Sequence, residues 1–244
     1  MINIIITAGG TIEPIDKVRK ITNNSSGKLG SIIANTLLEN ENIFIYYICT
    51  RKSIKPLVKN TNIKIIEIET VNQLKNIVEK LLKEKRIDYF IHSMAVSDYY
   101  VDYVTTASIM EENIDIKNIK KSILNPSKKL DNSSKISSNE DNLIVVLKQS
   151  PKIINSIKKL SSKTKLIGFK LLENVSKEEL LKVSINLKNK NNCDYVIAND
   201  LKNINKYTHK ALIIDKNDNY IEVNTKEEIA KKINELIKFH WLKK

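Results

Sequence analysis

The sequence predicts an α/β fold: a Rossmann-like, mainly parallel central sheet flanked by helices, with a long mobile flap and a C-terminal hairpin. Short apolar runs alternate with amphipathic segments along the 244 residues, which is the pattern of successive β–α–β units. The first apolar run also leads directly into a glycine-containing loop and then into a helical segment. A content of 41% hydrophobic and 28% charged residues is ordinary for a globular protein.

The first half of the chain supplies a strand–loop–helix unit and then further strands. The first strand is expected at residues 2–7 (INIIIT) and the helix at 27–39. A second helix is expected at 71–85, because Leu74, Val78 and Leu81 fall on one helical face. The other apolar runs have the length of strands, at 43–50, 63–68 and 88–96.

The pattern fails between Tyr103 and Ser138. Asn, Ser and Lys dominate this stretch, Pro126 interrupts it, and no period persists. A loop of that length inside a compact domain is uncommon unless it closes over a ligand. We therefore expect residues 103–138 to form a mobile flap.

Periodic structure is expected again from residue 143 to the end. A helix should follow Pro151, and the last helix should run from Thr225 to Trp241, with Thr225 and Glu228 in capping-box spacing. The chain has neither an internal repeat nor a domain linker, so one domain over residues 1–244 is expected. The remaining segments are strands at 143–147, 165–170 and 194–200, a helix at 176–189, and a hairpin formed by 210–215 and 220–224.

The net charge of +13 raises the hypothesis of nucleic-acid binding. Lysine accounts for nearly all of the excess, and the only arginines are Arg19, Arg51 and Arg86. The lysines are spread along the chain without a basic stripe interleaved with aromatics, so we favour solvated lysine faces and expect no nucleic-acid partner.

No apolar run approaches the roughly 20 residues that span a bilayer, so no membrane partner is expected either. Cys49 and Cys193 have no metal or redox spacing, which suits a reducing cytoplasm.

The opening loop is the first candidate site. The stretch TAGGTIEPIDKVRKITNNSSGKLG runs from Thr7 to Gly30 between the first strand and the first helix. Gly9 and Gly10 allow backbone amides to approach a ligand, and Ser25 or Ser26 could cap a helix that Gly27 begins. The loop is neither Gly-x-Gly-x-x-Gly nor a Walker loop. A ligand-binding loop and a long turn both stay open on this pattern.

Common catalytic motifs do not occur. The chain has no Tyr-x-x-x-Lys pair and no Gly-x-Ser-x-Gly elbow. His92, His209 and His240 are scattered, so no metal site is expected, and His92 on an apolar strand is interpreted as a packing residue.

At this point the motifs indicate a family. The opening stretch closely resembles the start of phosphopantothenate–cysteine ligase, also called phosphopantothenoylcysteine synthetase. Further matches follow in the same order: SMAVSDY at 93–99, SKISS at 134–138, IGFK at 167–170 and IANDL at 197–201. Because the chain starts at the ligase's first strand, it resembles the stand-alone bacterial form, and no flavin is expected.

The resemblance implies a two-step ligation in coenzyme A biosynthesis. The carboxylate of 4′-phosphopantothenate attacks the α-phosphate of a nucleoside triphosphate and releases pyrophosphate, and the amine of cysteine then displaces the nucleotide. Bacterial members characteristically use CTP, with an acyl-cytidylate intermediate, and eukaryotic members use ATP. Mg²⁺ would travel with the triphosphate, and a homodimer is implied. An NAD(P)-dependent oxidoreductase on a Rossmann-like fold is the alternative, and a noncatalytic nucleic-acid binder is a second one.

The resemblance also suggests roles for particular residues. Asn23 matches an asparagine associated with the acyl-nucleotide intermediate, and Arg19 offers a planar fork for a carboxylate or phosphate. Lys135 matches the first lysine of a Lys-x-Lys-Lys element that reads Lys-Ile-Ser-Ser here, so Lys128 or Lys129 are candidate substitutes. Asn23, Ser25, Ser26 and Gly27 are the expected substrate-binding residues.

The expected nucleotide site draws on several segments. Backbone groups of Ser93, Met94 and Ala95 would read the base edge, although Met94 and Ser97 depart from the family pattern. Phe169 would lie against base or ribose. The other expected nucleotide ligands are Gly9, Gly10, Asp98, Lys135, Pro151, Lys152 (in place of an acidic residue), Ile153, Ile154 and Lys190.

Overall fold

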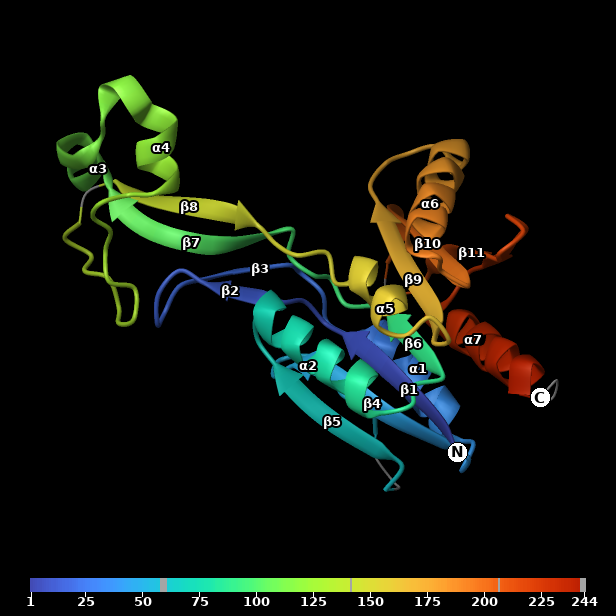
Figure 1. Cartoon of the computed structure of the whole chain (residues 1–244). Helices are drawn as coiled ribbons and strands as arrows, with labels where there is room; N and C mark the ends of the chain where they lie inside the picture. Colours follow the sequence, from blue (N-terminus) through green and yellow to red (C-terminus); the bar gives the residue numbers. More distant parts are fainter. Residues whose placement is uncertain (58–60, 141, 206, 242–244) are drawn as a thin grey trace.

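The structure is a computed structural model that describes residues 1–57, 61–140, 142–205 and 207–241. Its centre is a mainly parallel sheet in the strand order β12-β11-β10-β9-β6-β1-β4-β5 (Figure 1). The pairs from β10 to β5 are parallel, and β11 and β12 add two antiparallel strands at one edge. This arrangement confirms the predicted fold class. The strands are β1 (Ile2–Ala8), β4 (Ile43–Thr50), β5 (Ile63–Ile68), β6 (Tyr89–His92), β9 (Lys165–Leu172), β10 (Tyr195–Ile204), β11 (His209–Ile214) and β12 (Tyr220–Val223).

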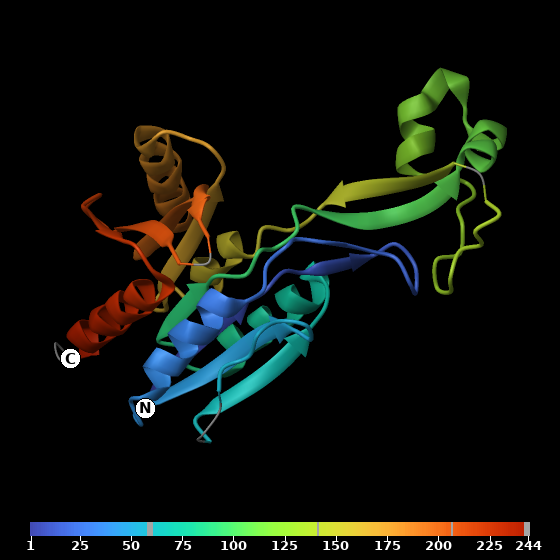
Figure 2. The same ribbon diagram turned by 180° about the vertical axis from the view of Figure 1, so that it is seen from behind.

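Helices cover both faces of the sheet, which is why its central strands are apolar throughout rather than alternating. One face packs against α1 (Lys28–Leu38) and α7 (Lys226–Trp241), seen in front in Figure 2. The other face packs against α2 (Val71–Glu84), α5 (Ile154–Leu160) and α6 (Lys177–Asn191). Ile4, Ile5 and Ile6 of β1 have no exposed surface, because helices lie on both sides of them. No helix in these described ranges is long and apolar enough to cross a membrane.

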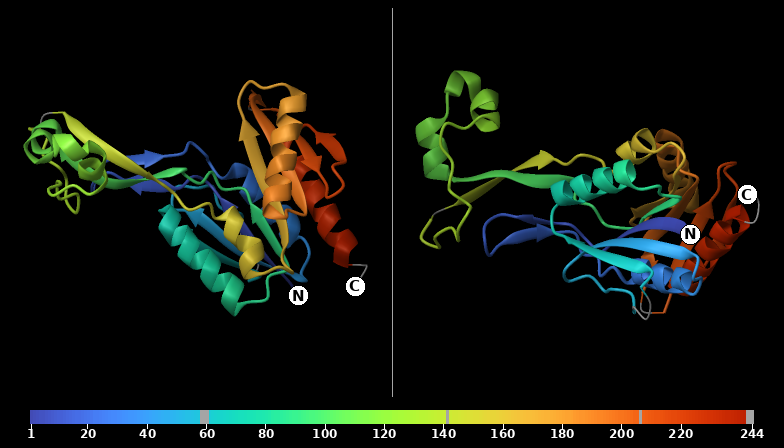
Figure 3. Two further views of the ribbon diagram at one scale, coloured as in Figure 1. Left: turned by 45° about the horizontal axis from the view of Figure 1, so that its top comes forward. Right: turned by 60° about the horizontal axis from the view of Figure 1, so that its bottom comes forward.

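Two β-ribbons project from the sheet on the side where the parallel strands end (Figures 1 and 3). The first is the hairpin of β2 (Ile12–Pro14) and β3 (Lys20–Thr22). The second pairs β7 (Tyr99–Thr106) with β8 (Leu143–Gln149) and carries α3 (Ala107–Asn113), the 3-10 turn η1 (Ile116–Asn118) and α4 (Ile119–Leu124) at its far end. We call residues 99–149 the arm.

The hairpin within the opening loop and the strand β7 were not predicted from the sequence. Each strand of the hairpin has only three residues, too few to show a period. The predicted strand at 88–96 ends at His92, because the chain then leaves the sheet to follow the loop after β1.

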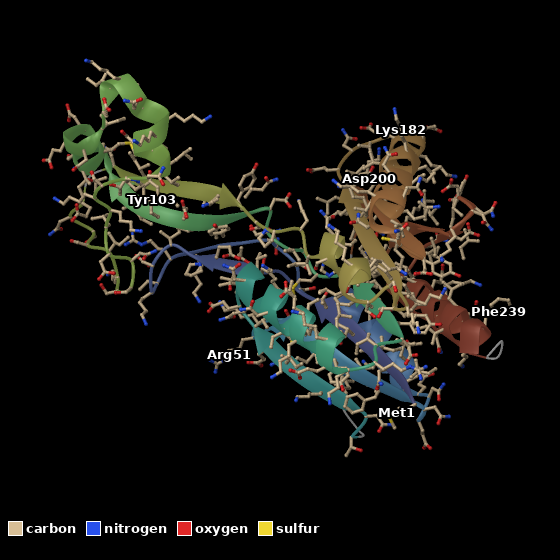
Figure 4. All side chains as sticks on the ribbon, viewed as in Figure 1. Met1, Arg51, Tyr103, Lys182, Asp200 and Phe239 are labelled. Atoms are coloured by element: carbon tan, nitrogen blue, oxygen red, sulfur yellow. The ribbon has the colours of Figure 1, made fainter. Side chains whose placement is uncertain are left out.

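The expected flap, residues 103–138, contains more regular structure than the sequence suggests. β7 continues to Thr106, and α3 and α4 follow. These short helices bury no residues, so no apolar period marks them. Their ordering depends on local contacts, such as the hydroxyl of Tyr103, which donates to the carbonyl of Ile123 at 2.6 Å (Figure 4). The closure of this flap over a ligand stays a prediction.

Candidate functional site

The glycine loop after β1 is packed too closely for side chains. Gly9 has φ +86°, and a Cβ there would lie 1.9 Å from Oγ of Ser53. A Cβ on Gly10 would lie 2.1 Å from the backbone oxygen of Asn23. The loop therefore brings the chain at Asn23 against the end of β1, as a ligand-binding loop built for close backbone approach requires.

The loop after β6 runs beside the loop after β1. The amide of Ser93 donates to Thr7 O at 3.2 Å, and Ala95 donates to Gly9 O at 2.8 Å while accepting from Thr11 N at 3.1 Å. These amide donors hold the two loops together, and the expected reading of a base edge by the Ser93–Ala95 backbone stays a prediction. Met94 is buried in the core on the α2 side rather than exposed to a ligand.

His92, the last residue of β6, lies beside Thr7 under these two loops. Its Nδ1 lies 2.8 Å from the hydroxyl of Thr7, and its ring packs edge-on against Phe90 with centroids 5.7 Å apart. Burial lowers the pKa of His92 to about 4. A neutral imidazole hydrogen-bonded to a threonine agrees with the interpretation of His92 as a packing residue.

Asn23 lies at the base of the hairpin with its carboxamide available. The side chain is half-buried, and it makes no hydrogen bond to any residue in the part of the chain that the structure describes. A half-buried amide can both donate to and accept from a ligand without titrating. We call Gly9, Gly10 and Asn23 the hairpin base.

The start of α1 lies next to Gly9, because a Cβ on Gly27 would lie 3.2 Å from the backbone nitrogen of Gly9, and it differs by one residue from the prediction. The helix begins at Lys28, and Gly27, with φ +75°, is its N-cap without a side-chain cap. Ser26 Oγ accepts from Lys28 N at 3.3 Å, a weak contact, and Ser25 is half-buried. An α-helix leaves its first amides without an intrahelical partner, so this end can receive an anion.

Asp98 and Lys152 form an ion pair where the arm leaves and rejoins the sheet. Both side chains are largely exposed, and the amide of Ser150 donates to Asp98 O at 2.8 Å. Pro151 is half-buried, and Ile153 and Ile154 pack into the core at the start of α5. Lys152 therefore neutralises the carboxylate that was predicted to lie beside the nucleotide.

Arg19 and Lys135 are held at the other end of the hairpin. Asp16, which is 2% exposed, accepts from the amides of Val18 (2.8 Å), Arg19 (2.7 Å) and Ile136 (3.2 Å). The guanidinium of Arg19 donates to Asp16 at 2.9 Å and to the carbonyl of Ile136 at 2.7 Å. These contacts, led by the Arg19 amide, lower the pKa of Asp16 to about 2. We call Asp16 and Arg19 the hairpin tip.

The tip thus fixes the flap residue next to Lys135, whose own side chain is exposed. Lys135 makes no ion pair with any described residue. Arg19 lies four residues before Asn23, so β3 separates the two Cα atoms by about 13 Å at the rise of an extended chain. Within one chain, the structure does not bring Arg19 and Lys135 to Asn23.

Lys190 occupies a different position from the one predicted, whereas the contact of Phe169 with base or ribose stays a prediction. Phe169 is half-buried on β9 and packs against the core that α1 and α7 cover. Lys190 lies in the last turn of α6, which runs antiparallel to the strands. At 1.5 Å per residue this turn is about 20 Å from the start of the helix, so Lys190 lies at the amino edge of the sheet, away from the glycine loop.

Two acidic residues of the hairpin were missed by sequence reasoning. Asp16 has a local signal, since an aspartate followed three residues later by arginine suits a side-chain-capped turn. Glu13 has none: its buried carboxylate accepts from the amide of Val71 at 2.9 Å and ties the hairpin to the start of α2. Burial raises the pKa of Glu13. No group of three or more His, Cys, Asp and Glu side chains within the described ranges could hold a metal ion.

Comparisons with known proteins agree on one family. The model of the DNA/pantothenate metabolism flavoprotein C-terminal domain matches residues 1–123 and 125–239. The coenzyme A biosynthesis bifunctional protein CoaBC of Thermococcus kodakarensis is 30% identical over 231 residues, covering 94% of this chain and 49% of that protein. The chain thus spans about half the length of the curated relatives it matches.

Solved structures give the same result. The crystal structure of the DNA/pantothenate metabolism flavoprotein from Streptococcus pneumoniae superposes with a TM-score of 0.85 at 36% identity, covering 98% of this chain and all of that one. The C-terminal domain of a CoaBC protein, at 20% identity and a TM-score of 0.70 over 100% of this chain and 97% of that one, shares the fold.

Proposed function

Since this chain belongs to the family of the DNA/pantothenate metabolism flavoprotein C-terminal domain, we propose that it is a ligase joining 4′-phosphopantothenate to L-cysteine in coenzyme A biosynthesis. The relatives named for coenzyme A biosynthesis support this activity. Residues 1–244 would act as one domain, in the cytoplasm, where the buried free thiols of Cys49 and Cys193 stay reduced. The motif resemblance favours this ligase over an oxidoreductase.

The observation that carries the proposal is the hairpin base beside the open start of α1. In the first step a carboxylate oxygen of phosphopantothenate attacks the α-phosphorus, the bond to the β-phosphate oxygen breaks, and pyrophosphate leaves. In the second step the cysteine nitrogen attacks the acyl carbon, loses a proton and expels the nucleoside monophosphate. Both steps move negative charge between oxygens, so fixed donors matter more than a strong base.

The residues of this region divide that work. The first amides of α1 would hold phosphate oxygens, and Gly9 and Gly10 leave room for them. The carboxamide of Asn23 would hold the acyl phosphate while the amine approaches. Mg²⁺, bound through phosphate oxygens, would supply further charge neutralisation. Neither step changes an oxidation state, so the reaction needs no flavin.

The nucleotide is proposed to be CTP. With the amides of Ser93 and Ala95 committed to the neighbouring loop, acceptor groups are left to read the base. Cytosine and adenine both present an amine donor, so the base preference must be measured. Purified protein should release pyrophosphate from CTP faster than from ATP, and only with phosphopantothenate present. Release from neither nucleotide, with both substrates supplied, would contradict the ligase proposal.

We also propose that two copies of the chain share each site. The separation of Arg19 and Lys135 from Asn23 supports this arrangement, in which the tip and flap of one protomer reach the hairpin base of its partner. Closure of the flap within one chain is the competing explanation.

A mixing experiment separates these two arrangements. Asn23→Ala and Lys135→Ala proteins are prepared separately, then mixed and allowed to exchange subunits. If sites are shared, each mixed dimer keeps one intact site, and the mixture recovers about a quarter of the wild-type activity. If each chain closes over its own residues, no mixed dimer has an intact site and no activity returns.

A further inference from the structure

The amino edge of the sheet, opposite the glycine loop, carries a hollow of about 810 Å³. It lies between the starts of β6 and β9, the turn after α5 and the turn between β11 and β12. Such a volume falls within the range of about 300–1,000 Å³ typical of small-molecule clefts. Cations dominate its charged lining, which consists of Arg86, Lys158, Lys163, Lys165 and Lys216 against the carboxylates of Asp88 and Asp194.

Asp194 is the centre of this lining. Its carboxylate is 2% exposed and accepts from the amide of Leu166 at 2.9 Å. Three ammonium groups converge on it, from Lys158 at 2.7 Å and from Lys165 and Lys216 at 3.0 Å. One buried carboxylate balances one of these charges, so the half-enclosed space keeps a positive excess.

An adjoining hollow of about 410 Å³ shares Lys158 and Lys216 and adds Lys188. The Lys188 side chain is only 4% exposed. Its ammonium donates to the carbonyls of Asp215 at 3.0 Å and Lys216 at 2.8 Å. It is also paired with the carboxylate of Asp218 at 2.5 Å, so the positive excess of the larger hollow comes from the lysines around Asp194.

Helix termini explain part of this cluster. Lys158 and Lys188 lie in the last turns of α5 and α6, where a cation offsets the negative end of the helix. Lys165 and Lys216 lie outside helices and are paired with Asp194, whereas Lys163 lies neither at a helix end nor in that ion-pair cluster. Lys163 is exposed and forms no ion pair with a residue of the described ranges.

We propose that this amino-edge hollow binds a small polyphosphate, an anion with two or more phosphate groups. Ammonium groups on flexible stems act as point charges that can surround several phosphate oxygens. A hollow selects a small anion, whereas an extended nucleic acid would need an open basic face. The proposal uses no residue of the glycine loop and is independent of the ligase proposal.

The test compares two variants of equal charge. Tripolyphosphate is titrated by calorimetry at fixed ionic strength into wild type, into Lys163→Ala/Lys216→Ala, and into Lys159→Ala/Lys182→Ala. Lys159 and Lys182 are exposed on α5 and α6 outside the hollow, and Figure 4 labels Lys182. The first variant should bind about tenfold more weakly or worse, as expected for the loss of charged contacts, whereas the second should match wild type.

A site-resolved measurement accompanies the titration. Labelling with an amine-reactive reagent, read by mass spectrometry, should slow severalfold at Lys163 and Lys216 when tripolyphosphate is present, and should not change at Lys159. Equal affinity for the two double variants, or equal protection at all these lysines, would overturn the proposal. Tripolyphosphate binding at the glycine loop would be common to all three proteins, and the labelling of Lys163 and Lys216 distinguishes it from binding in the hollow.

Discussion

The base and the tip of the hairpin β2–β3 are built on different principles. At the base, glycines let backbone approach backbone, and a Cβ on Gly10 would overlap the oxygen of Asn23. At the tip, one buried carboxylate, Asp16, collects the amides of its own turn and of Ile136, 120 residues further along the chain.

The position of the base is therefore fixed by close backbone packing, whereas the position of the tip is fixed by hydrogen bonds. The base is packed directly against the end of β1 in the central sheet. The tip is a joint between two projecting segments, and it places Lys135 relative to Arg19 without tying either residue to the sheet. The base is suited to holding a ligand with rigidly placed backbone amides. The tip is suited to bringing the charge of Lys135 towards a ligand once that ligand has bound.

The largest effect is expected at Gly10. In Gly10→Ala the new Cβ would meet backbone rather than a flexible side chain, so the base must open. We expect ligase activity to fall by about 100-fold or more, since a displacement of about 1 Å can cost that much. Gly168→Ala on β9 is the matched control, because its nearest neighbours are side-chain atoms at 3.3 Å. Wild-type turnover in Gly10→Ala would show that the close packing of the hairpin base is not needed for the reaction.

Asn23→Ala tests the carboxamide without disturbing the packing. The variant should fold normally and still form the acyl nucleotide, but pass it poorly to cysteine, with turnover reduced about 100-fold, as for loss of one positioned donor. Rapid-quench measurement of intermediate and product separates the two steps. Asn24→Ala, an exposed neighbour, is the control. Unchanged product formation would show that Asn23 only shapes its turn.

Lys135→Ala should raise the KM for the nucleotide and lower kcat, by about tenfold or more in kcat/KM, because an ammonium that neutralises phosphate is lost. Lys128→Ala, on the same flap, should change kcat/KM by less than twofold. Steady-state kinetics with CTP varied checks both. Equal, small effects of the two substitutions would show that Lys135 is a solvated surface lysine without a role in nucleotide binding.

Asp16→Asn should loosen the tip and reveal itself in the pH dependence of stability. The folded-state pKa of Asp16 lies at about 2, below the ordinary value of 3.8, so its charged form stabilises the fold above pH 4. That contribution is lost as the pH falls from about 4 towards 2. Thermal melts should therefore show wild type losing more Tm than Asp16→Asn across this window. Parallel acid limbs for the two proteins would argue against the role of the charge, and Asp98→Asn provides an exposed comparison.

The smallest effect is expected at Lys190, in spite of the sequence-based prediction that it binds nucleotide. Its position at the far end of α6 predicts that Lys190→Ala changes kcat/KM by less than twofold. A tenfold loss in the same assay would mean that the amino edge takes part in the reaction.

The sheet could be predicted from the sequence because each buried strand is a local run of apolar residues. INIIITA and IFIYYICT are apolar enough to need cover on both faces, and the helices between them follow. The hairpin β2–β3 could not be predicted, since three-residue strands show no alternation. The hydrogen bond between Asp16 and Ile136 could not be predicted either, because it forms only when the flap folds back onto the hairpin. Motif matching pointed to Gly9 and Gly10, where close packing restricts the residue type, and to Asn23, whose role stays a prediction. It misplaced Lys190, because a lysine in a lysine-rich helix has no such restriction.

The neck of the arm has a consequence for how this fold can vary. Asp98 and Ser150 are hydrogen-bonded to each other, and Lys152 reaches back to Asp98, so the chain departs and returns at adjoining points. Everything between them is an insert on a closed stem. It can be shortened, lengthened or exchanged for a different excursion while the register of the central strands stays the same.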